Sequence, residues 1–94
     1  MTIEYTPEAR HDLVDAIARV HRENPLAAAR LADRILSRVE RLAAGDFDGA
    51  ELTLTTGERV RSWAVSPYRI YYRREPNRLL VVRVYHQARQ PIAL

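Results

Sequence analysis

The sequence predicts an α+β fold in which an N-terminal helical hairpin packs on one face of a small antiparallel sheet. Two cap-and-proline pairs, Thr6-Pro7 and Asn24-Pro25, each precede an apolar stripe at helical spacing. Near the C-terminus, aromatic and β-branched residues flank a polar Pro76-Asn77 turn, which is typical of a β-hairpin. Because 94 residues leave room for one two-layer core, we expect a single domain spanning residues 1–94.

The element order that these signals predict is β-α-α-β-β-β. Residues 2–5 suit a first strand, a first helix runs from Pro7 to about residue 22, and a second runs from Pro25 to about residue 44. Gly45 is available as a left-handed C-cap, and the short link between the helices makes them fold back on each other. The apolar stripes expected to face the sheet are Ala9, Leu13, Ala16, Ile17 and Val20, then Ala28, Leu31, Ile35, Val39 and Leu42, supported by Ala32 and Leu36.

Alternation along the remaining strands predicts which side chains share a face. Residues 51–56 suit either a loop or an irregular strand, residues 58–65 form a strand, and residues 68–73 and 79–86 form the hairpin. The face under the helices is expected to hold Ile70, Tyr72, Leu80, Val82, Val84 and His86. The open face is expected to hold Arg69, Tyr71, Arg73, Arg83 and Tyr85, joined by Arg59, Arg61 and Trp63 if Val60 and Ala64 face inward. An exposed Trp63 would need a cover, since exposed apolar patches usually mark contact sites.

Arginine supplies all fifteen basic residues, which give the chain a net charge of +3 and a pI near 9.8. The guanidinium group binds carboxylates and phosphates bidentately and stacks on bases, whereas only lysine can be tuned to act as a base. The chain is therefore suited to anionic partners, either nucleic acid or an acidic protein. The absence of lysine also has a simple explanation in the codon usage of a GC-rich genome.

Several classes of protein are excluded by what the sequence lacks. With no cysteine, there are no disulfides and no thiolate metal sites. No apolar run approaches the roughly 18 residues that span a bilayer, and the N-terminus lacks a basic-then-apolar secretory signal. We therefore expect a cytoplasmic protein without membrane contact. His11 and His21 lie on the first helix without partners at metal-ligand spacing, so neither a metal site nor a cofactor is expected.

Arginine and tyrosine on one sheet face suit phosphate and base contacts, and equally an acidic, apolar partner segment. Histidine is the side-chain type whose ordinary pKa suits proton transfer near neutrality. His86, however, is expected on the opposite face from Arg69 and Arg83, so it is either a structural histidine or an acid/base group that a bulge brings round. A stripe of arginines along the second helix is either a solvated face or a binding surface, and it consists of Arg30, Arg34, Arg38 and Arg41.

The order of residues in the C-terminal hairpin resembles that of a known family. Residues 68–72 (YRIYY), a turn, residues 79–86 (LLVVRVYH), Arg89 and Pro91 follow two helices, as in toxins of the ParE/RelE superfamily of bacterial type II toxin–antitoxin modules. The ending resembles the ParE branch most. RelE-type nucleases resemble one another in lysine or arginine clusters and a late tyrosine, and this chain has no lysine.

Resemblance to the ParE branch implies a toxin that inhibits DNA gyrase without enzymatic activity and is neutralised by a cognate ParD-like antitoxin in a hetero-oligomer. Direct contact with nucleic acid is compatible with this function but not required. The residues expected to bind the target are Arg59, Arg61, Arg69, Tyr71, Arg73, Arg83 and Arg89. The residues expected to bind the antitoxin are Trp63, Tyr71, Arg73 and Tyr85.

Two alternatives stay open at this point. A RelE-type toxin would be a ribosome-dependent mRNA endoribonuclease, which needs a cation for the scissile phosphate, a general base and a general acid. Its catalytic residues would have to come from His86, Arg69, Arg83 and Tyr85. A plain binding module or an inert remnant would show neither gyrase inhibition nor RNA cleavage.

Overall fold

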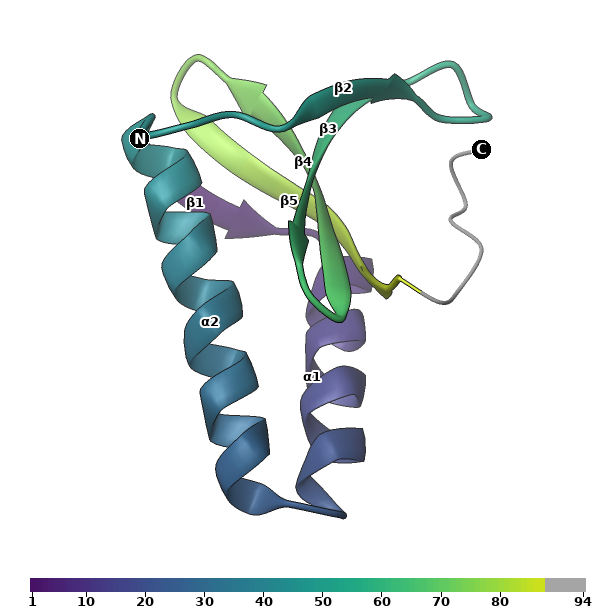
Figure 1. Cartoon of the computed structure of the whole chain (residues 1–94). Helices are drawn as coiled ribbons and strands as arrows, with labels where there is room; N and C mark the ends of the chain where they lie inside the picture. The colour runs from purple at the N-terminus through teal and green to yellow at the C-terminus, as the bar shows by residue number, and fades with distance from the viewer. Residues whose placement is uncertain (88–94) are drawn as a thin grey trace.

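Five strands and two helices make up the part of the chain that the computed structural model describes, residues 1–87 (Figure 1). In chain order they are β1 Thr2–Tyr5, α1 Pro7–His21, α2 Pro25–Ala44, β2 Ala50–Thr53, β3 Arg59–Val65, β4 Tyr68–Glu75 and β5 Arg78–His86. The α+β class and the N-terminal helical hairpin are confirmed. The segment that suited either a loop or an irregular strand contributes a short strand, β2.

Both helices begin at the caps that the sequence predicts. The Thr6 hydroxyl accepts a hydrogen bond from the N–H of Ala9, and the Asn24 side-chain oxygen accepts one from the N–H of Ala27, both at 3.0 Å. Each cap satisfies an N–H group that has no partner within the first helical turn, a contribution of about 1 kcal/mol. Gly45 ends α2 in the left-handed region with a φ of +82°, where a residue without Cβ is least strained.

The sheet combines antiparallel and parallel pairing. Its strand order is β1-β5-β4-β3-β2, and the four strands from β2 to β5 pair antiparallel, as expected. β1 pairs parallel with the first half of β5, from Arg78 to Val81. Thr6 then ends this pairing, because its N–H donates to the carbonyl of Val81 at 3.0 Å and its hydroxyl donates to that of Val82 at 2.8 Å. The second half of β5 is therefore not covered by β1.

The two helices lie on one face of the sheet and share the main core with it (Figure 1). In α2 the whole predicted stripe is buried, and in α1 Ala9 and Ala16 are buried while Leu13 and Val20 pack against the same core. The sheet contributes Val65, Tyr68, Ile70, Tyr72, Leu79, Val81 and Val84. The predicted helix faces are therefore confirmed for these residues, because helical periodicity alone places them on one side. Leu36, also expected to face the sheet, is 45% exposed, and Ile17 is half-buried outside the core cluster.

A β-bulge interrupts the alternation of side chains in β5. Tyr71 of β4 pairs with Arg83, but the next residue, Tyr72, pairs with Val81. Val82 is therefore an extra residue that has no partner on β4. A bulge of this kind shifts the phase of alternation, so the residues before it face the opposite way from the expectation for an unbroken strand.

The predicted faces of β5 are therefore right after the bulge and wrong before it. Leu79 is fully buried in the main core, whereas Leu80 pairs with Arg73 and Val82 packs on the far side of the sheet. Val84 lies in the main core, as predicted. The expectation that Leu80 and Val82 face the helices failed because a strict period of two does not continue through an inserted residue.

Candidate functional site

The sheet face turned away from the helices, called here the open face, carries an apolar cluster of its own. Val60, Tyr71 and Tyr85 are its buried members, and Leu52, Leu54 and Val82 pack against them. The rings of Tyr71 and Tyr85 meet edge to face with their centroids 6.1 Å apart, an arrangement that aromatic quadrupoles favour. Burial raises the pKa of Tyr71. Both tyrosines lie on the predicted face, but with exposures of 5% and 8% they are already largely covered.

Arg83 is held at the edge of the open face by Asp12 of α1. Its Nε and Nη2 donate to the two carboxylate oxygens of Asp12 at 2.8 and 3.1 Å, and its guanidinium carbon lies 4.4 Å from the centroid of the Tyr85 ring. The hydrogen bonds to Asp12 raise the pKa of Arg83. The same carboxylate accepts a hydrogen bond from the N–H of Val84 at 3.0 Å. Asp12 thus satisfies the edge of β5 where β1 no longer pairs.

Arg69 and Arg73 also lie on the open face, as predicted, but their surroundings differ. Arg73 forms ion pairs with Glu58 at 2.8 Å and with Glu75 at 3.2 Å. Arg69 donates from Nη1 to the Ser62 hydroxyl at 3.0 Å, and it forms no ion pair with any carboxylate among residues 1–87. Its charge is therefore the more available of the two to an external anion.

Trp63, Arg61 and Arg59 do not join the open face. Val60 belongs to the cluster on that face, so alternation along β3 turns the side chains on either side of it toward the helices. Trp63 accordingly pairs with Ile70 and packs against the main core. The sequence-based assumption that Val60 faces the helices is wrong. Both faces of β3 carry apolar residues, so alternation alone does not indicate which face turns toward the helices.

Trp63 is covered from within the chain. Its ring centroid lies 4.5 Å from that of Phe47, which belongs to the link between α2 and β2, and 5.9 Å from the guanidinium carbon of Arg38. Arg41 lies 5.0 Å from the Phe47 ring. Two arginines of the α2 stripe therefore pack on aromatic faces, a favourable cation–π arrangement. Trp63 is therefore half-buried within the chain and does not lie uncovered on the open face.

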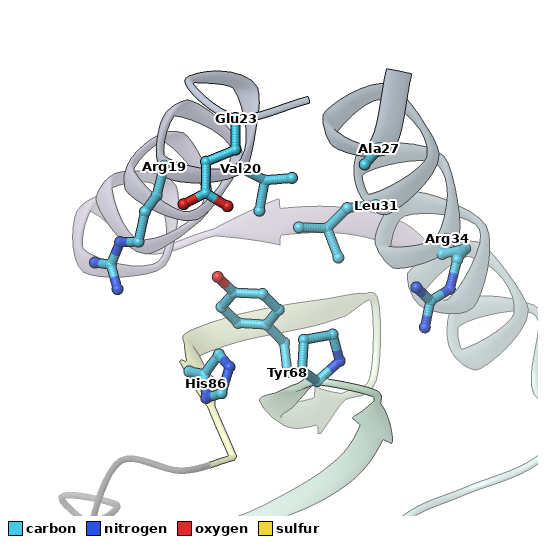
Figure 2. Close-up of a pocket in the computed structure, with 9 residues that line it drawn as sticks. Arg19, Val20, Glu23, Ala27, Leu31, Arg34, Tyr68 and His86 are labelled. Carbon is cyan, nitrogen blue, oxygen red and sulfur yellow. The ribbon is translucent and has the colours of Figure 1, made fainter. Parts of the chain in front are cut away.

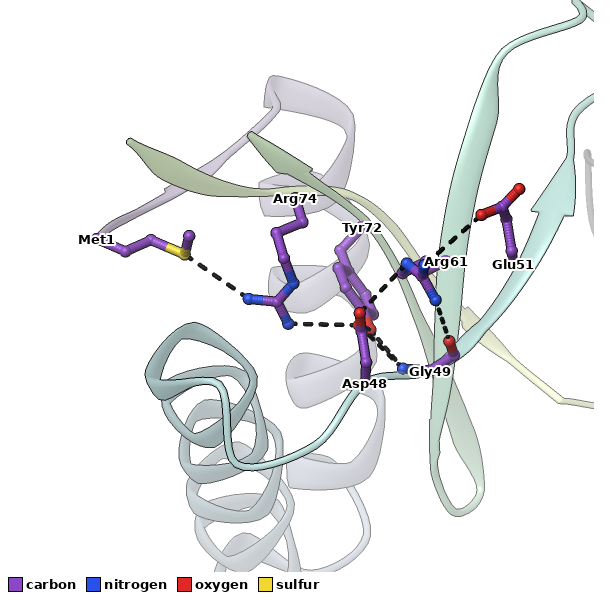
Figure 3. Close-up of polar contacts among 7 residues, drawn as sticks. All are labelled: Met1, Asp48, Gly49, Glu51, Arg61, Tyr72 and Arg74. Carbon is purple, nitrogen blue, oxygen red and sulfur yellow. Dashed lines mark hydrogen bonds and ion pairs between the residues drawn. The ribbon is translucent and has the colours of Figure 1, made fainter. Parts of the chain in front are cut away.

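A polar network fixes the link between α2 and β2 (Figure 3). The Tyr72 hydroxyl donates to Asp48 and accepts a hydrogen bond from the Gly49 N–H at 2.7 Å. Arg61 and Arg74 each form an ion pair with Asp48 at 3.3 Å. Burial, together with the hydrogen bond to Asp48, raises the pKa of Tyr72 to about 12. Burial acts to raise the pKa of Asp48, but hydrogen bonds from Tyr72 and Arg74 bring it below its ordinary value.

A pocket of about 430 Å³ opens between the two helices and the end of the sheet (Figure 2). His86 lines it and meets the ring of Tyr68 edge to face, with the centroids 5.2 Å apart. His86 therefore lies on the helix side of the sheet, as predicted, while Arg69 and Arg83 lie on the other side. Of the proposed nuclease residues, Arg69, Arg83 and Tyr85 meet on the open face, where Arg69 pairs with Tyr85 and Arg83 lies over the Tyr85 ring. His86 is separated from these three by the sheet.

Some functional expectations fall on residues that the structure does not describe, and some features lie beyond the reach of the sequence. Arg89 lies outside the described residues. Asp12 was not predicted, because its contact with Arg83 joins positions 71 residues apart in the chain. Its position next to Leu13, at the border of the α1 stripe, is the one signal that could have indicated it.

Within residues 1–87 no helix is long and apolar enough to cross a membrane, and no three His, Asp or Glu side chains gather as metal ligands would.

Comparisons with known proteins identify the family. A family model described as the ParE toxin of the type II toxin–antitoxin system parDE matches residues 3–91. A curated relative, Toxin RelE3 of Caulobacter vibrioides, is 32% identical over 85 residues, which cover 90% of this chain and 92% of the relative. A solved structure described as the chromosomal ParDE TA system from P. aeruginosa has a TM-score of 0.74 at 19% identity and covers 92% of this chain and 95% of its own, which supports the fold. The chain belongs to the ParE toxin family of type II toxin–antitoxin systems, within the ParE/RelE superfamily.

Proposed function

We propose that this toxin acts by binding DNA gyrase and that it has no catalytic activity of its own. The observation that carries the proposal is the separation of His86 from Arg69 and Arg83 by the thickness of the sheet. General acid–base catalysis needs a proton-transfer group within hydrogen-bond reach of the reacting atoms. With no lysine in the chain and its arginines permanently charged, the open face offers cations that bind but do not transfer protons.

The surface proposed to bind gyrase is the open face together with the C-terminal end of the chain. Arg69 is its best described candidate, because it has no carboxylate partner among residues 1–87. Tyr71, Arg73 and Arg83 lie on the same face, and Arg89 follows β5 in the sequence. Arg59 and Arg61 leave the proposed set, because both pair with Glu51 away from this face.

A brief pulse of expression tests the proposal against its main alternative. Gyrase inhibition should induce the SOS response and leave gyrase-trapped breaks in DNA, with no new cuts in mRNA. The alternative, a RelE-type ribosome-dependent mRNA endoribonuclease, draws support from the 32% identity to a relative named Toxin RelE3. Ribosome-dependent mRNA cuts without DNA damage would establish that alternative instead. If neither DNA damage nor mRNA cuts are found, the protein is a plain binding module.

His86 provides a second discriminating variant. A nuclease that uses the imidazole as an acid or base should lose roughly a hundredfold or more in rate on His86→Ala substitution. A toxin that inhibits by binding the open face should keep most of its toxicity, because His86 lies on the other side of the sheet. Circular dichroism of the purified variant is needed to show that the contact with Tyr68 is not essential for folding.

We further propose that the toxin is neutralised by a ParD-like antitoxin encoded beside it. Membership of the parDE family supports this, and so does the similarity to a structure described as a ParDE system. Co-purification of the two proteins from the native gene pair is the expected result. Normal growth when the toxin is expressed without its neighbour would contradict the toxin function itself.

A further inference from the structure

The apolar cluster on the open face is more deeply buried than the elements around it explain. Its members Val60, Tyr71 and Tyr85, called here the open-face cluster, are 2%, 5% and 8% exposed. Both helices lie on the other side of the sheet (Figure 1). Among residues 1–87 the apolar neighbours of the cluster come only from the sheet and from the turn that follows β2. Because a sheet face turned to water normally keeps part of its side chains exposed, these low values indicate a further cover.

The chain leaves the sheet directly beside this cluster. The N–H of Gln87 donates to the carbonyl of Pro67 at 2.7 Å, so the backbone of β5 is held to its neighbour up to that residue. Side chains alternate along a strand, which puts Gln87 on the same face as Tyr85, two residues earlier. Tyr85 pairs with Arg69 on β4. The segment that follows Gln87 therefore starts next to the open-face cluster and next to Arg69.

Residues 88–94 have the composition and the length to form the cover. Their sequence, ARQPIAL, has apolar residues at Ile92 and Leu94, and Pro91 favours extended backbone at the residue before it. In an extended segment Ile92 and Leu94 share one face. The cluster spans β5, β4 and β3, which is two strand spacings or about 10 Å. Seven extended residues reach at most about 23–25 Å, so this segment can cross the whole cluster.

We propose that residues 88–94 cross the open face and dock Ile92 and Leu94 on the open-face cluster. The docking itself is independent of the proposed function, but its consequence rests on that function. A docked segment holds Arg89 beside Arg69, so the chain's own tail and the sheet together form the surface that binds the target. Ile92 and Leu94 are then positioning residues, which act through Arg89 and not by touching the target themselves.

Limited digestion of the purified toxin with trypsin tests the docking. Trypsin cleaves after Arg89 when the segment leaves the sheet, so the cleavage rate follows the fraction of molecules in which the segment is undocked. The double variant Ile92→Ser, Leu94→Ser should be cleaved there about tenfold faster or more, because its docking surface is lost. Ala93→Ser is the matched control at the alternate position and should stay within about twofold of the wild type. Mass spectrometry identifies the cleaved bond.

A change on the sheet side tests the same contact without altering the cleaved segment. Leu54 packs against the open-face cluster from the turn after β2, so Leu54→Ser should also speed cleavage after Arg89, by about threefold or more. Leu36→Ser is its control, because Leu36 is an exposed leucine on α2, away from the open face. All these variants should keep the wild-type circular dichroism spectrum.

Growth inhibition tests the consequence for target binding. The double variant keeps Arg89 but should lose toxicity by about tenfold or more in colony counts, since Arg89 is no longer held beside Arg69. The conservative pair Ile92→Val, Leu94→Met should restore both slow cleavage and toxicity, because it restores the apolar surface.

The failure of this inference can be told apart from the failure of the proposed function. Wild-type cleavage rates in both the double variant and Leu54→Ser would overturn the docking. Faster cleavage with undiminished toxicity would overturn the positioning role of Ile92 and Leu94. A wild-type protein that inhibits no growth would overturn the proposed function and leave the cleavage result as it stands.

Discussion

Asp12 and Arg83 join α1 to the bulged part of β5 through a bidentate ion pair, in which the Asp12 side chain is only 8% exposed. The Asp12 carboxylate also accepts the N–H of Val84, at the point where β1 no longer pairs with β5. One side chain therefore satisfies a guanidinium group and a strand edge together. Its removal leaves both without an acceptor, which is more costly than the loss of an exposed ion pair.

We expect Asp12→Ala to lower the free energy of unfolding by about 1.5–3 kcal/mol, the usual cost of losing hydrogen bonds to a charged group. Asp15→Ala is the matched control on the same helix. It removes the exposed pair with Arg19, whose contribution should be under about 1 kcal/mol. Urea unfolding of both variants measures the difference. Equal losses would show that the Asp12 pair adds no more than a surface ion pair does.

The bulge predicts opposite outcomes for two neighbouring valines. Val81 is fully buried in the main core, so Val81→Ala should cost about 1.5–3 kcal/mol through lost burial and cavity formation. Val82 is half-buried on the open face, so Val82→Ala should cost less than about 1 kcal/mol. Thermal or urea unfolding gives both values. A larger loss for Val82 would mean that β5 runs without the bulge.

Tyr72 should make the protein sensitive to alkali. The pKa of its hydroxyl is raised to about 12 in the folded state, above the ordinary value of 10.0. The stabilisation from this group is therefore complete below pH 10 and is lost as the pH rises from about 10 to about 12, because the unfolded state releases the proton first.

Tyr72→Phe isolates this effect. At neutral pH it should cost about 0.5–1.5 kcal/mol, because Asp48 loses a donor and the Gly49 N–H keeps only its second acceptor, Asp48 Oδ1, at 3.1 Å. Between pH 10 and 12 its stability should fall less steeply than that of the wild type. Parallel slopes for the two proteins, measured by urea unfolding across this range, would show that another group is responsible for the alkaline loss.

Arg69→Ala is the cleanest test of the open face as the target-binding surface. It removes a guanidinium group that has no carboxylate partner among residues 1–87, so toxicity should be abolished while the melting temperature stays near that of the wild type. Arg22→Ala, at the exposed C-cap of α1, is the control and should remain toxic. Toxicity undiminished in Arg69→Ala would remove the open face from consideration.

Arg83→Ala is a weaker test than Arg69→Ala. The sequence places Arg83 among the target-binding residues of the open face, but in the structure it is the partner of a buried carboxylate. Removing it leaves Asp12 buried without its cation, so lower stability and lower toxicity should appear together. Arg89→Ala, which changes a residue that follows β5 in the sequence, is the second variant to test beside Arg69→Ala.

The sequence by itself determined the helices, their ends and the existence of the hairpin. Thr6, Asn24 and Gly45 act on backbone groups within one helical turn of themselves, so their effect can be predicted from neighbouring residues alone. The apolar stripes follow from helical periodicity in the same local way. The sequence also predicted correctly that His86 and Arg69 lie on opposite faces of the sheet. The bulge precedes both Arg83 and His86, so the alternation of side chains after it is unbroken.

Only the tertiary structure decided which side of each strand faces the helices and which charges remain available. The orientation of β3, the bulge at Val82 and the Asp12–Arg83 pair all depend on contacts between residues far apart in the chain. A shift of one residue in strand register exchanges every side chain between the faces of a sheet, and strands that are apolar on both sides carry no local signal against it. The pocket between the helices and β5 has the same origin, since its walls come from three separate segments that meet only in the folded chain.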